Sequence, residues 1–448
     1  MRKLFGTDGI RGVAGEFPLD DATVRTIGRA LTQQFREKLG RDPRFVTGRD
    51  TRESGERIER AFHTGAAAEG AEGKSSGLIT TPGVAFVTGK FEFDAGIVIS
   101  ASHNPYKDNG IKIFLPDGKK VGEDVERAIE LAVDESSAGD AIAGEFEIDD
   151  SRAETYQAEY SKHLISEVDG LRLVGLKIAV DCANGAASGF APRLFERLGA
   201  DVIAIHAEPS GRNINENCGS LHLEHLQKSV IDERADFGVA FDGDADRALF
   251  VDEKGNIVDG DGTLWIMSRF LRDRGGLENG TVIATVMSNI GLEIALASRG
   301  LKLFRTPVGD KYVLEELLKS GSDLGGEQSG HVIFPKESLV GDGMMTALFM
   351  LDALRSRGGS FSEMLNGFVR YPQVLVNVHV KEKKPFDDVD EIAAASKQIE
   401  DQLEGEGRLL LRYSGTENLA RVMIEGKDQA RIEEQANGLA EVIRASLG

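Results

Sequence analysis

Short apolar runs that close in glycine or aspartate turns recur along most of the chain, and segments with helical spacing follow them. Examples are PRFVTGRD, AGIVISASHNP, LKIAVDCANGA, DFGVAFDGDADR and TVIATVMSN. A short apolar run bounded by turns is typical of a buried strand, and strands alternating with helices predict α/β domains with mixed, largely parallel sheets. Ligands of such domains bind beyond the carboxyl ends of the strands, which is where these polar turns fall.

One intervening segment, from Asp20 to Leu39, has the complete pattern of an amphipathic helix. Asp20 or Asp21 is expected to cap its start, and Gly40 is expected to end it. Four apolar residues at spacings of three or four form its stripe: Val24, Ile27, Leu31 and Phe35. We interpret this helix as core packing, without a role in a site.

The length of 448 residues exceeds what one hydrophobic core supports, so several domains are expected. An acidic stretch of small residues from Asp134 predicts a first boundary, and a second is expected near Glu253 to Asp259. After Tyr371 the pattern changes to a strand, a helix beginning near Asp387, two strands that flank SGTEN and a last helix. The expected division is therefore three α/β domains, 1–152, 153–254 and 255–370, and a smaller α+β domain, 371–448.

Composition narrows the range of partners. The chain has 53 Lys and Arg against 74 Asp and Glu, a formal charge of −21, and no basic block. This argues against nucleic acid or an anionic membrane and favours a small-molecule ligand. No signal-peptide pattern or run of 18 apolar residues is found, which predicts a cytoplasmic protein. The two cysteines, Cys182 and Cys218, form no CxxC pair, so a disulfide framework or thiolate zinc site has little support.

The strongest chemical pattern is DGDADR, residues 242–247, between the apolar runs FGVAF and ALFV. In an extended backbone, Asp242, Asp244 and Asp246 share one face, so their carboxylates can converge on one hard cation. An EF-hand begins with the same spacing, but Arg247 occupies the position that requires glycine, and strands flank the loop. A solvated acidic turn is the alternative, and it gives no reason for three neighbouring charges. We therefore expect a metal site.

A second pattern, SASHNP at residues 100–105, follows the apolar run GIVIS. Pro105 keeps Asn104 out of the helical region, so the loop can present the Ser102 hydroxyl rigidly. An ordinary Ser/Asn turn is the plain alternative. A hydrolase built on Ser102 and His103 is weaker, because adjacent side chains seldom face each other usefully.

Two further loops suit a phosphorylated sugar. Residues 412–418, RYSGTEN, with Arg421 beyond them, offer hydroxyls, a glycine and guanidinium groups suited to a phosphate dianion. Residues 325–331, GGEQSGH, offer a carboxylate, an amide and a hydroxyl suited to sugar hydroxyls, and a titratable histidine. A hairpin turn and a polar connection are the respective alternatives. His222 and His225 lack the spacing of a zinc motif and are interpreted as a solvated helix face.

Five motifs in this order, FGTDGIRG, ISASHNP, DGDADR, GEQSGH and SGTE, strongly resemble the α-D-phosphohexomutase family over the whole chain. Within that family, FGTDGIRG, NPYKDNGIKIF, VDCANGAA and NINENCGS are most similar to bacterial-type members that act on glucosamine phosphates. The resemblance implies four domains around one central cleft: phosphoserine, metal-binding, sugar-recognition and phosphate-binding domains in chain order. Tyr413 and Asn418 stand where family members commonly have proline, which puts the rigidity of the phosphate loop in question.

The resemblance also implies residue roles. Ser102 would be the phosphoserine and, with Asp242, Asp244 and Asp246, a Mg²⁺ ligand. The other implied catalytic residues are Arg11, Lys112, Arg247 and His331, with Lys112 and His331 both candidates for the general acid/base. The implied substrate contacts are Thr7, Glu327, Ser329, Arg412, Ser414, Gly415, Thr416 and Arg421.

The activity implied is interconversion of glucosamine 6-phosphate and glucosamine 1-phosphate through a bisphosphorylated sugar, on the route to UDP-N-acetylglucosamine. Mg²⁺ is the expected cofactor, a glucosamine or glucose 1,6-bisphosphate the expected activator, and a monomer or homodimer the expected assembly. The alternatives are a mutase of the same family for glucose or mannose phosphates, a metal-dependent sugar phosphatase, and a sugar-phosphate sensor without catalysis. The mutase is favoured because a second, distant phosphate clamp is something a phosphatase does not need.

Overall fold

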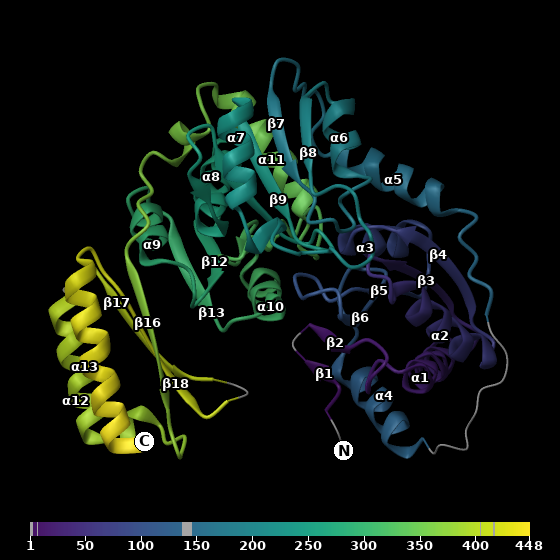
Figure 1. Cartoon of the computed structure of the whole chain (residues 1–448), viewed down its shortest axis with the longest axis horizontal. Coiled ribbons are helices and arrows are strands. Elements are labelled where there is room, and N and C mark those ends of the chain that lie inside the picture. Colours follow the sequence, from purple (N-terminus) through teal and green to yellow (C-terminus); the bar gives the residue numbers. More distant parts are fainter. Residues whose placement is uncertain (1–2, 7, 137–145, 404, 415–416) are drawn as a thin grey trace. The chain divides into compact units, whose positions relative to one another are not determined.

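The computed structural model describes residues 3–6, 8–136, 146–403, 405–414 and 417–448. The chain divides into two compact units, Met1–Thr285 with Thr306–Asn366, and Val286–Arg305 with Gly367–Gly448. We describe each unit by itself (Figure 1). Among the helices of the described residues, none is both long and apolar enough to cross a membrane.

Helix α1 (Asp21–Leu39) forms as its sequence predicts. The Asp20 side chain accepts a hydrogen bond from the amide of Thr23, 3.0 Å, and Gly40 ends the helix with φ +68°. The predicted stripe of Val24, Ile27, Leu31 and Phe35 is buried. The local pattern alone therefore determines where this helix begins, ends and packs.

The first unit begins with a mixed six-stranded sheet in the order β1-β2-β6-β5-β3-β4. Strand β3 runs parallel to β4 and β5, whereas β6 is antiparallel to β5 and β2. The strands are β1 (Phe5–Gly6), β2 (Gly9–Val13), β3 (Arg44–Arg49), β4 (Glu72–Leu78), β5 (Ala95–Ile99) and β6 (Asp108–Phe114). The other helices of this part are α2 (Gly55–Ala68), α3 (Thr81–Lys90) and α4 (Glu123–Glu135).

Alternating side chains place apolar groups on both faces of this sheet. In β3, Phe45 belongs to the core under α1, α2 and α4, whereas Val46 belongs to the core under α3. In β5, Ile97 likewise belongs to the core under α1, α2 and α4, and Val98 belongs to the core under α3. Because neighbouring residues of a strand point to opposite faces, two helical layers cover one sheet. The expected α/β/α arrangement follows.

The first expected boundary stretch lies largely outside the described residues, since 137–145 are not described. Helix α5 (Ala153–Ser166) follows it and leads to a second mixed sheet, β11-β10-β9-β7-β8. Its strands are β7 (Lys177–Asp181), β8 (Asp201–Ile205), β9 (Phe237–Phe241), β10 (Ala248–Asp252) and β11 (Ile257–Val258). Helix α7 (Glu224–Glu233) packs on β7 and β9, and α6 (Ala191–Arg197) packs on β8 (Figure 1).

The rest of the first unit is a smaller α/β assembly. Strand β12 (Thr281–Thr285) is parallel to β14 (Gly325–Gly326), which is antiparallel to β15 (Val332–Ile333). Its helices are α8 (Gly260–Asp273), α10 (Asp310–Ser320) and α11 (Gly343–Arg357). Helix α10 packs on β12 and β14, and α8 packs on α11.

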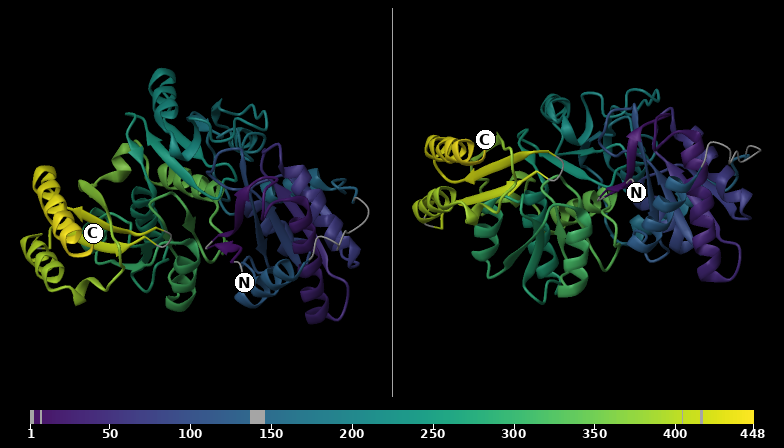
Figure 2. Two further views of the ribbon diagram at one scale, coloured as in Figure 1. Left: turned by 60° about the horizontal axis from the view of Figure 1, so that its bottom comes forward. Right: turned by 90° about the horizontal axis from the view of Figure 1, so that it is seen from below.

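The second unit contains an antiparallel sheet, β16-β18-β17, with α12 and α13 against it (Figures 1 and 2). Its elements are α9 (Ile290–Ala297), β13 (Lys302–Thr306), β16 (Gln373–His379), α12 (Asp390–Leu403), β17 (Arg408–Tyr413), β18 (Leu419–Glu425) and α13 (Gln429–Leu447). The order of strand, helix, two strands and helix is the predicted one. Helix α12 begins three residues later than expected, because a short 3-10 turn, Phe386–Asp388, precedes it.

Candidate active site

A cavity of about 400 Å³ opens in the first unit. Its described lining brings together eight charged or titratable residues from all three sheet assemblies of this unit: Asp8, Arg11, His103, Asp246, Arg247, Asp310, Glu327 and His331. Five of these, Arg11, Asp246, Arg247, Glu327 and His331, are predicted site residues. Four of the five sequence motifs, FGTDGIRG, ISASHNP, DGDADR and GEQSGH, therefore contribute to one cavity, although they are far apart in the chain.

The three aspartates after β9 converge through a tight turn. The amide of Ala245 donates to the carbonyl of Asp242, 3.1 Å, and Ala245 has φ +55°. Asp242, Asp244 and Asp246 are all buried, and one carboxylate oxygen of each lies within 4.8 Å of the others. The convergence that the spacing predicts is present, but a turn produces it and not the extended backbone that we expected.

This cluster fits a divalent cation. Asp244 Oδ1 and Asp246 Oδ1 are buried and accept no hydrogen bond from the described residues. Burial together with Asp246 and Asp244 raises the pKa of Asp242 well above its usual value. Buried carboxylates without enough partners are costly, and oxygen donors suit Mg²⁺. The donor set and its unsatisfied atoms therefore match the expected metal site.

Ser102 projects into the same cluster from the loop after β5. Its hydroxyl donates to Asp242 Oδ2 at 2.5 Å, and its Oγ lies 3.3 Å from His103 Nδ1. Adjacent serine and histidine side chains do face each other here, contrary to our general expectation for neighbours. Burial, and then Arg247, lower the pKa of His103 to about 4, so this ring is neutral at physiological pH.

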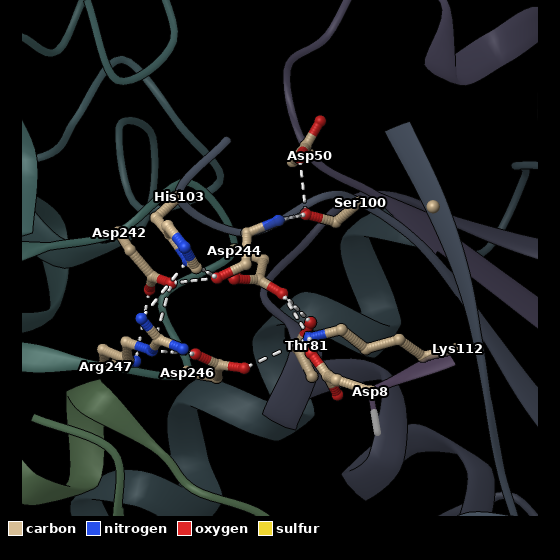
Figure 3. Close-up of polar contacts among 12 residues, drawn as sticks. Asp8, Asp50, Thr81, Ser100, His103, Lys112, Asp242, Asp244, Asp246 and Arg247 are labelled. Carbon is tan, nitrogen blue, oxygen red and sulfur yellow. Dashed lines mark hydrogen bonds and ion pairs between the residues drawn. The ribbon is translucent and has the colours of Figure 1, made fainter. Parts of the chain in front are cut away.

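Lys112, on β6, is surrounded by carboxylates (Figure 3). Its Nζ lies 3.1 Å from Asp8, 3.1 Å from Asp244 and 3.2 Å from Asp246. Burial opposes its charge, but Asp244, Asp8 and Asp246 outweigh burial and raise the pKa of Lys112 well above its usual value. Lys120 joins the network through ion pairs of 2.6 Å to Asp8 and 2.7 Å to Asp310. Lys112 is thus held in its charged form beside the aspartate cluster.

Arg247 and His331 approach the cluster from its other side. Arg247 Nε lies 3.8 Å from Asp246 and 4.0 Å from Asp242, while its Nη1 lies 3.2 Å from His103 Nδ1 (Figure 3). His331 Nδ1 lies 3.6 Å from Asp246 Oδ1. Burial would lower the pKa of His331, but Asp246 outweighs it and raises the pKa to about 9.

The GEQSGH segment forms a tight connection between β14 and β15. The amide of Glu327 donates to the carbonyl of His331, 2.8 Å, and Glu327 Oε1 accepts from the amide of Gly309, 3.2 Å. The buried hydroxyl of Ser329 has no hydrogen-bond partner among the described residues. Glu327 thus lines the cavity. Ser329, two residues further along the chain, has a hydroxyl that no described residue hydrogen-bonds.

The RYSGTEN segment lies in the second unit. Arg412 in β17 pairs directly with Arg421 in β18, and the buried Nε of Arg421 has no hydrogen-bond partner among the described residues. Burial, and then Arg421, lower the pKa of Arg412. Like charges opposite each other in a sheet are unfavourable, so this pair is suited to an anion.

Tyr413, at a position where the family resemblance leads us to expect proline, is held by two contacts of its side chain. Its ring stacks on Phe386 with centroids 4.2 Å apart, and its hydroxyl donates to the carbonyl of Lys384, 2.5 Å. Ser414 Oγ accepts from the amide of Glu417, 3.3 Å. The predicted residues Thr7, Gly415 and Thr416 lie outside the described residues.

Several residues of the site were not singled out from sequence. Thr81, at the start of α3, donates its hydroxyl to Asp244 Oδ2 at 2.6 Å (Figure 3). Asp50 accepts from the Ser100 hydroxyl at 2.6 Å, and Ser100 Oγ accepts from the Ser102 amide at 2.9 Å. Asp8 stands inside the FGTDGIRG motif, so its position was available as a signal. Thr81 and Asp50 have no such signal, because only the fold brings them near.

A second group of possible ligands, Asp181, His206 and Cys218, is explained by ordinary hydrogen bonds. Asp181 accepts from the amides of Ala183 and Gly219 and from His206 Nδ1, 2.9 to 3.1 Å. His225, predicted to lie on a solvated helix face, is exposed and in α7, and its Nδ1 lies 3.1 Å from His206 Nε2. These contacts brace the loop that carries Cys218 and need no metal.

Comparison with known proteins covers the whole chain. Four phosphoglucomutase/phosphomannomutase family descriptions match in order: alpha/beta/alpha domain I at 2–140, domain II at 158–255, domain III at 259–371 and the C-terminal domain at 375–442. Proteins named phosphoglucosamine mutase from Solibacter usitatus and Thermoanaerobacter sp. are 48% and 47% identical to the chain. Both alignments cover 100% of this chain and 99% and 100% of the relatives.

Solved structures agree on the fold. A phosphoglucomutase/phosphomannomutase family protein from Burkholderia thailandensis gives a TM-score of 0.80 at 24% identity, covering 99% of this chain and 97% of that chain. An N-acetylphosphoglucosamine mutase from Aspergillus fumigatus, in complex with GlcNAc-6P and magnesium, gives 0.69 at 19% identity, covering 99% and 95%. The fold is three α/β/α domains and a small C-terminal domain. With four matching domains and full-length relatives near half identity, the chain belongs to the phosphoglucomutase/phosphomannomutase family, the α-D-phosphohexomutases.

Proposed function

We propose that this chain is a phosphoglucosamine mutase that interconverts glucosamine 6-phosphate and glucosamine 1-phosphate, on the route to UDP-N-acetylglucosamine. The observation that carries the proposal is the position of Ser102 Oγ, 2.5 Å from Asp242 within a buried three-aspartate cluster and beside an open cavity. A nucleophilic oxygen, a cation site and several basic groups are the parts that phosphoryl transfer requires. Full-length relatives 44 to 48% identical carry the name phosphoglucosamine mutase, which supports the sugar assignment.

In this proposal, phospho-Ser102 is the resting donor. A sugar hydroxyl attacks its phosphorus, the Ser102 O–P bond breaks, and a bisphosphorylated sugar forms. After the sugar turns over, its other phosphate returns to Ser102 Oγ and the isomeric monophosphate leaves. Lys112 and His331 are the two candidates for the general acid/base, and both lie against Asp246.

Electrostatics explains why the basic residues are needed. Two phosphate dianions about 6 Å apart, at an effective dielectric constant of about 20, repel by roughly 11 kcal/mol. Lys112, Arg11 and Arg247 are cations of the first unit that can offset this charge around Ser102. Mg²⁺ held by Ser102, Asp242, Asp244 and Asp246 would neutralise charge on the transferring phosphoryl group.

The phosphate that is not being transferred is assigned to the RYSGTEN loop. Arg412 and Arg421 are directly paired across two strands, and Arg421 Nε has no hydrogen-bond partner among the described residues, which supports an anion between or beside them. Ser414, Gly415 and Thr416 would add hydroxyl and amide donors. Glu327, Ser329 and Thr7 are proposed to contact the sugar and its phosphate. Such a clamp must accept either end of the sugar, so it should recognise phosphate more than sugar detail.

The remaining expectations extend the same proposal. We propose domain boundaries after residues 152, 254 and 370, which the matched ranges support. A glucosamine or glucose 1,6-bisphosphate is the proposed activator, and a structure of the Aspergillus fumigatus relative contains glucose 1,6-bisphosphate. A cytoplasmic location, a monomer or homodimer, and the lack of nucleic-acid or membrane partners stay predictions.

The test is incubation of the purified chain with Mg²⁺, a sugar bisphosphate and glucosamine 1-phosphate, followed by NMR of the products. Glucosamine 6-phosphate is expected; free phosphate would indicate a phosphatase, and no change would indicate a sensor. Intact-protein mass spectrometry should find one phosphoryl group that Ser102→Ala loses and the exposed control Ser356→Ala retains. Full activity in Ser102→Ala, with the phosphoryl group elsewhere, would overturn the mechanism.

A further inference from the structure

Ser102 has a backbone conformation that its residue type seldom adopts. Its φ is +52°, in the left-handed region, and the residue is buried. A non-glycine residue there persists only when its surroundings hold it, and such residues cluster at functional sites. The orientation of the Ser102 hydroxyl therefore depends on whatever fixes the backbone of this loop.

Two side chains donate hydrogen bonds to the same pair of carbonyls in this loop. Arg52 Nη2 donates to the carbonyls of Ser102 and Asn104 at 3.0 and 2.8 Å. Asn215 Nδ2 donates to the same two carbonyls at 2.8 and 3.0 Å. Four hydrogen bonds thus converge on two oxygens that flank His103. Because a peptide carbonyl fixes the ψ angle of its own residue, these bonds determine the direction in which Ser102 points.

Arg52 and Asn215 belong to different sheet assemblies. Arg52 follows β3 of the first sheet and is fully buried against Asp50, with Nε to Oδ2 at 2.9 Å. Asn215 lies between β8 and β9 of the second sheet, in the loop 213–219. The loop that carries Asn215 therefore ties the phosphate-accepting serine to the sheet that carries the aspartate cluster.

The loop 213–219 is itself anchored to the second sheet. The amide of Asn215 donates to the carbonyl of Ala183 at 2.9 Å, and Asn184 Nδ2 donates to the carbonyl of Asn213 at 3.2 Å. The amide of Gly219 donates to Asp181 Oδ2 at 3.1 Å. These contacts fix the backbone of the loop, so the side-chain amide of Asn215 has a defined position.

The backbone of the aspartate turn closes the same junction. A Cβ atom on Gly243 would lie 2.5 Å from the Ser102 carbonyl oxygen and 3.0 Å from Asn215 Nδ2. Only glycine fits at this position. The Ser102 carbonyl, the side-chain amide of Asn215 and the backbone of Asp242–Asp244 are therefore in close contact.

We propose that Asn215 is a positioning residue for phosphoryl transfer: it holds the Ser102 carbonyl and thereby aims Ser102 Oγ at the aspartate cluster. This inference rests on the proposed function of Ser102. Asn215 does not touch the reacting oxygen and acts through the backbone. A displacement of about 1 Å in a reacting group can lower a rate about 100-fold, so kcat should respond while substrate binding does not.

The test compares Asn215→Gly with the matched control Asn217→Gly. Both residues lie in the same loop with φ +58° and +51°, which glycine adopts readily, and Asn217 is exposed with no side-chain hydrogen bond among the described residues. Asn215→Gly is expected to lower kcat about 10- to 100-fold, with KM for glucosamine 1-phosphate changed less than about 3-fold. Asn217→Gly should match the wild type in both.

A second measurement does not depend on the proposed function. Hydrogen exchange of the amides of residues 100–104 and 106 should be about 10-fold faster in Asn215→Gly than in Asn217→Gly, because two of the four bonds to the loop carbonyls are lost. If Asn215→Gly melts far below the wild type, Asn215→Asp replaces it: this variant keeps the shape and loses the donor, and the same loss of kcat is expected.

Wild-type kcat and wild-type exchange in Asn215→Gly would overturn the inference. A rise in KM equal to the fall in kcat would also overturn it, since that result indicates loss of the binding site. If the wild-type protein isomerises no sugar phosphate, the proposed function fails; the exchange comparison then decides alone whether Asn215 holds the Ser102 loop.

Discussion

Thr81→Val is the substitution that most directly tests how the aspartate cluster is supported. The Thr81 hydroxyl donates to Asp244 Oδ2 at 2.6 Å, and the Thr81 amide donates to the Asp244 carbonyl at 2.9 Å. Valine keeps the shape and the amide bond and removes only the hydroxyl. The variant therefore isolates one short hydrogen bond to a buried carboxylate.

The magnitude follows from the partners that remain. A hydrogen bond to a charged group contributes about 1.5 to 3 kcal/mol. Lys112 Nζ still lies 3.1 Å from the same oxygen, so we expect the lower end of this range, about 1.5 kcal/mol. That energy corresponds to roughly 10-fold in an equilibrium constant, and loss of a group that orients a metal ligand costs about 10- to 100-fold in metal affinity.

The assay is the initial mutase rate as a function of Mg²⁺ concentration after treatment with a chelator. Thr81→Val should raise the half-saturating Mg²⁺ concentration about 10-fold, and the rate should recover to within about 3-fold of the wild type at saturation. Thr88→Val is the matched control, since its buried hydroxyl donates to the Val84 carbonyl within the same helix, 2.7 Å. An unchanged Mg²⁺ dependence in Thr81→Val, or an equal shift in Thr88→Val, would refute the reasoning.

Asp244→Asn should abolish most turnover with little change in melting temperature, because relief of repulsion with Asp242 and Asp246 offsets the weakened pairing with Lys112; full activity after exhaustive chelation would contradict the underlying metal role. Burial, and then Glu167, raise the pKa of Glu337 from 4.5 to about 7. Between pH 4.5 and about pH 7, the folded state therefore keeps a proton on Glu337 that the unfolded state has lost. The free energy of unfolding consequently falls as the pH rises through this range. Glu337→Gln should therefore raise the melting temperature at pH 8 by an amount equivalent to about 1 kcal/mol, after allowance for solvent screening, and leave it unchanged at pH 4; thermal melts at both pH values check this. Glucosamine phosphates should have kcat/KM values about 10- to 150-fold above those of glucose or mannose phosphates, since one hydrogen bond to the 2-amino group sets the preference; a coupled assay in which mannose 1-phosphate equals glucosamine 1-phosphate would refute the sugar assignment.

The sequence by itself determined the local elements and the chemical content of each loop. The stripe from Val24 to Phe35 specified α1, and the apolar runs on either side of DGDADR specified β9 and β10, because helix and strand periodicities depend on near neighbours. The motifs also indicated the family, and they singled out Ser102, Asp242, Asp244 and Asp246 as candidate site residues.

Tertiary structure alone decided which of these groups meet. Ser102 lies 140 residues from Asp242 and Thr81 lies 163 residues from Asp244, yet each pair shares a hydrogen bond. Asn215, 113 residues from Ser102, lies in the NINENCGS motif, but that motif gives no sign of a contact with the Ser102 loop. Even within DGDADR, a turn and not an extended strand brings the carboxylates together. The physical reason is that local patterns reflect interactions over a few residues, whereas a contact between distant loops depends on how complete domains pack and leaves no periodic trace in the sequence.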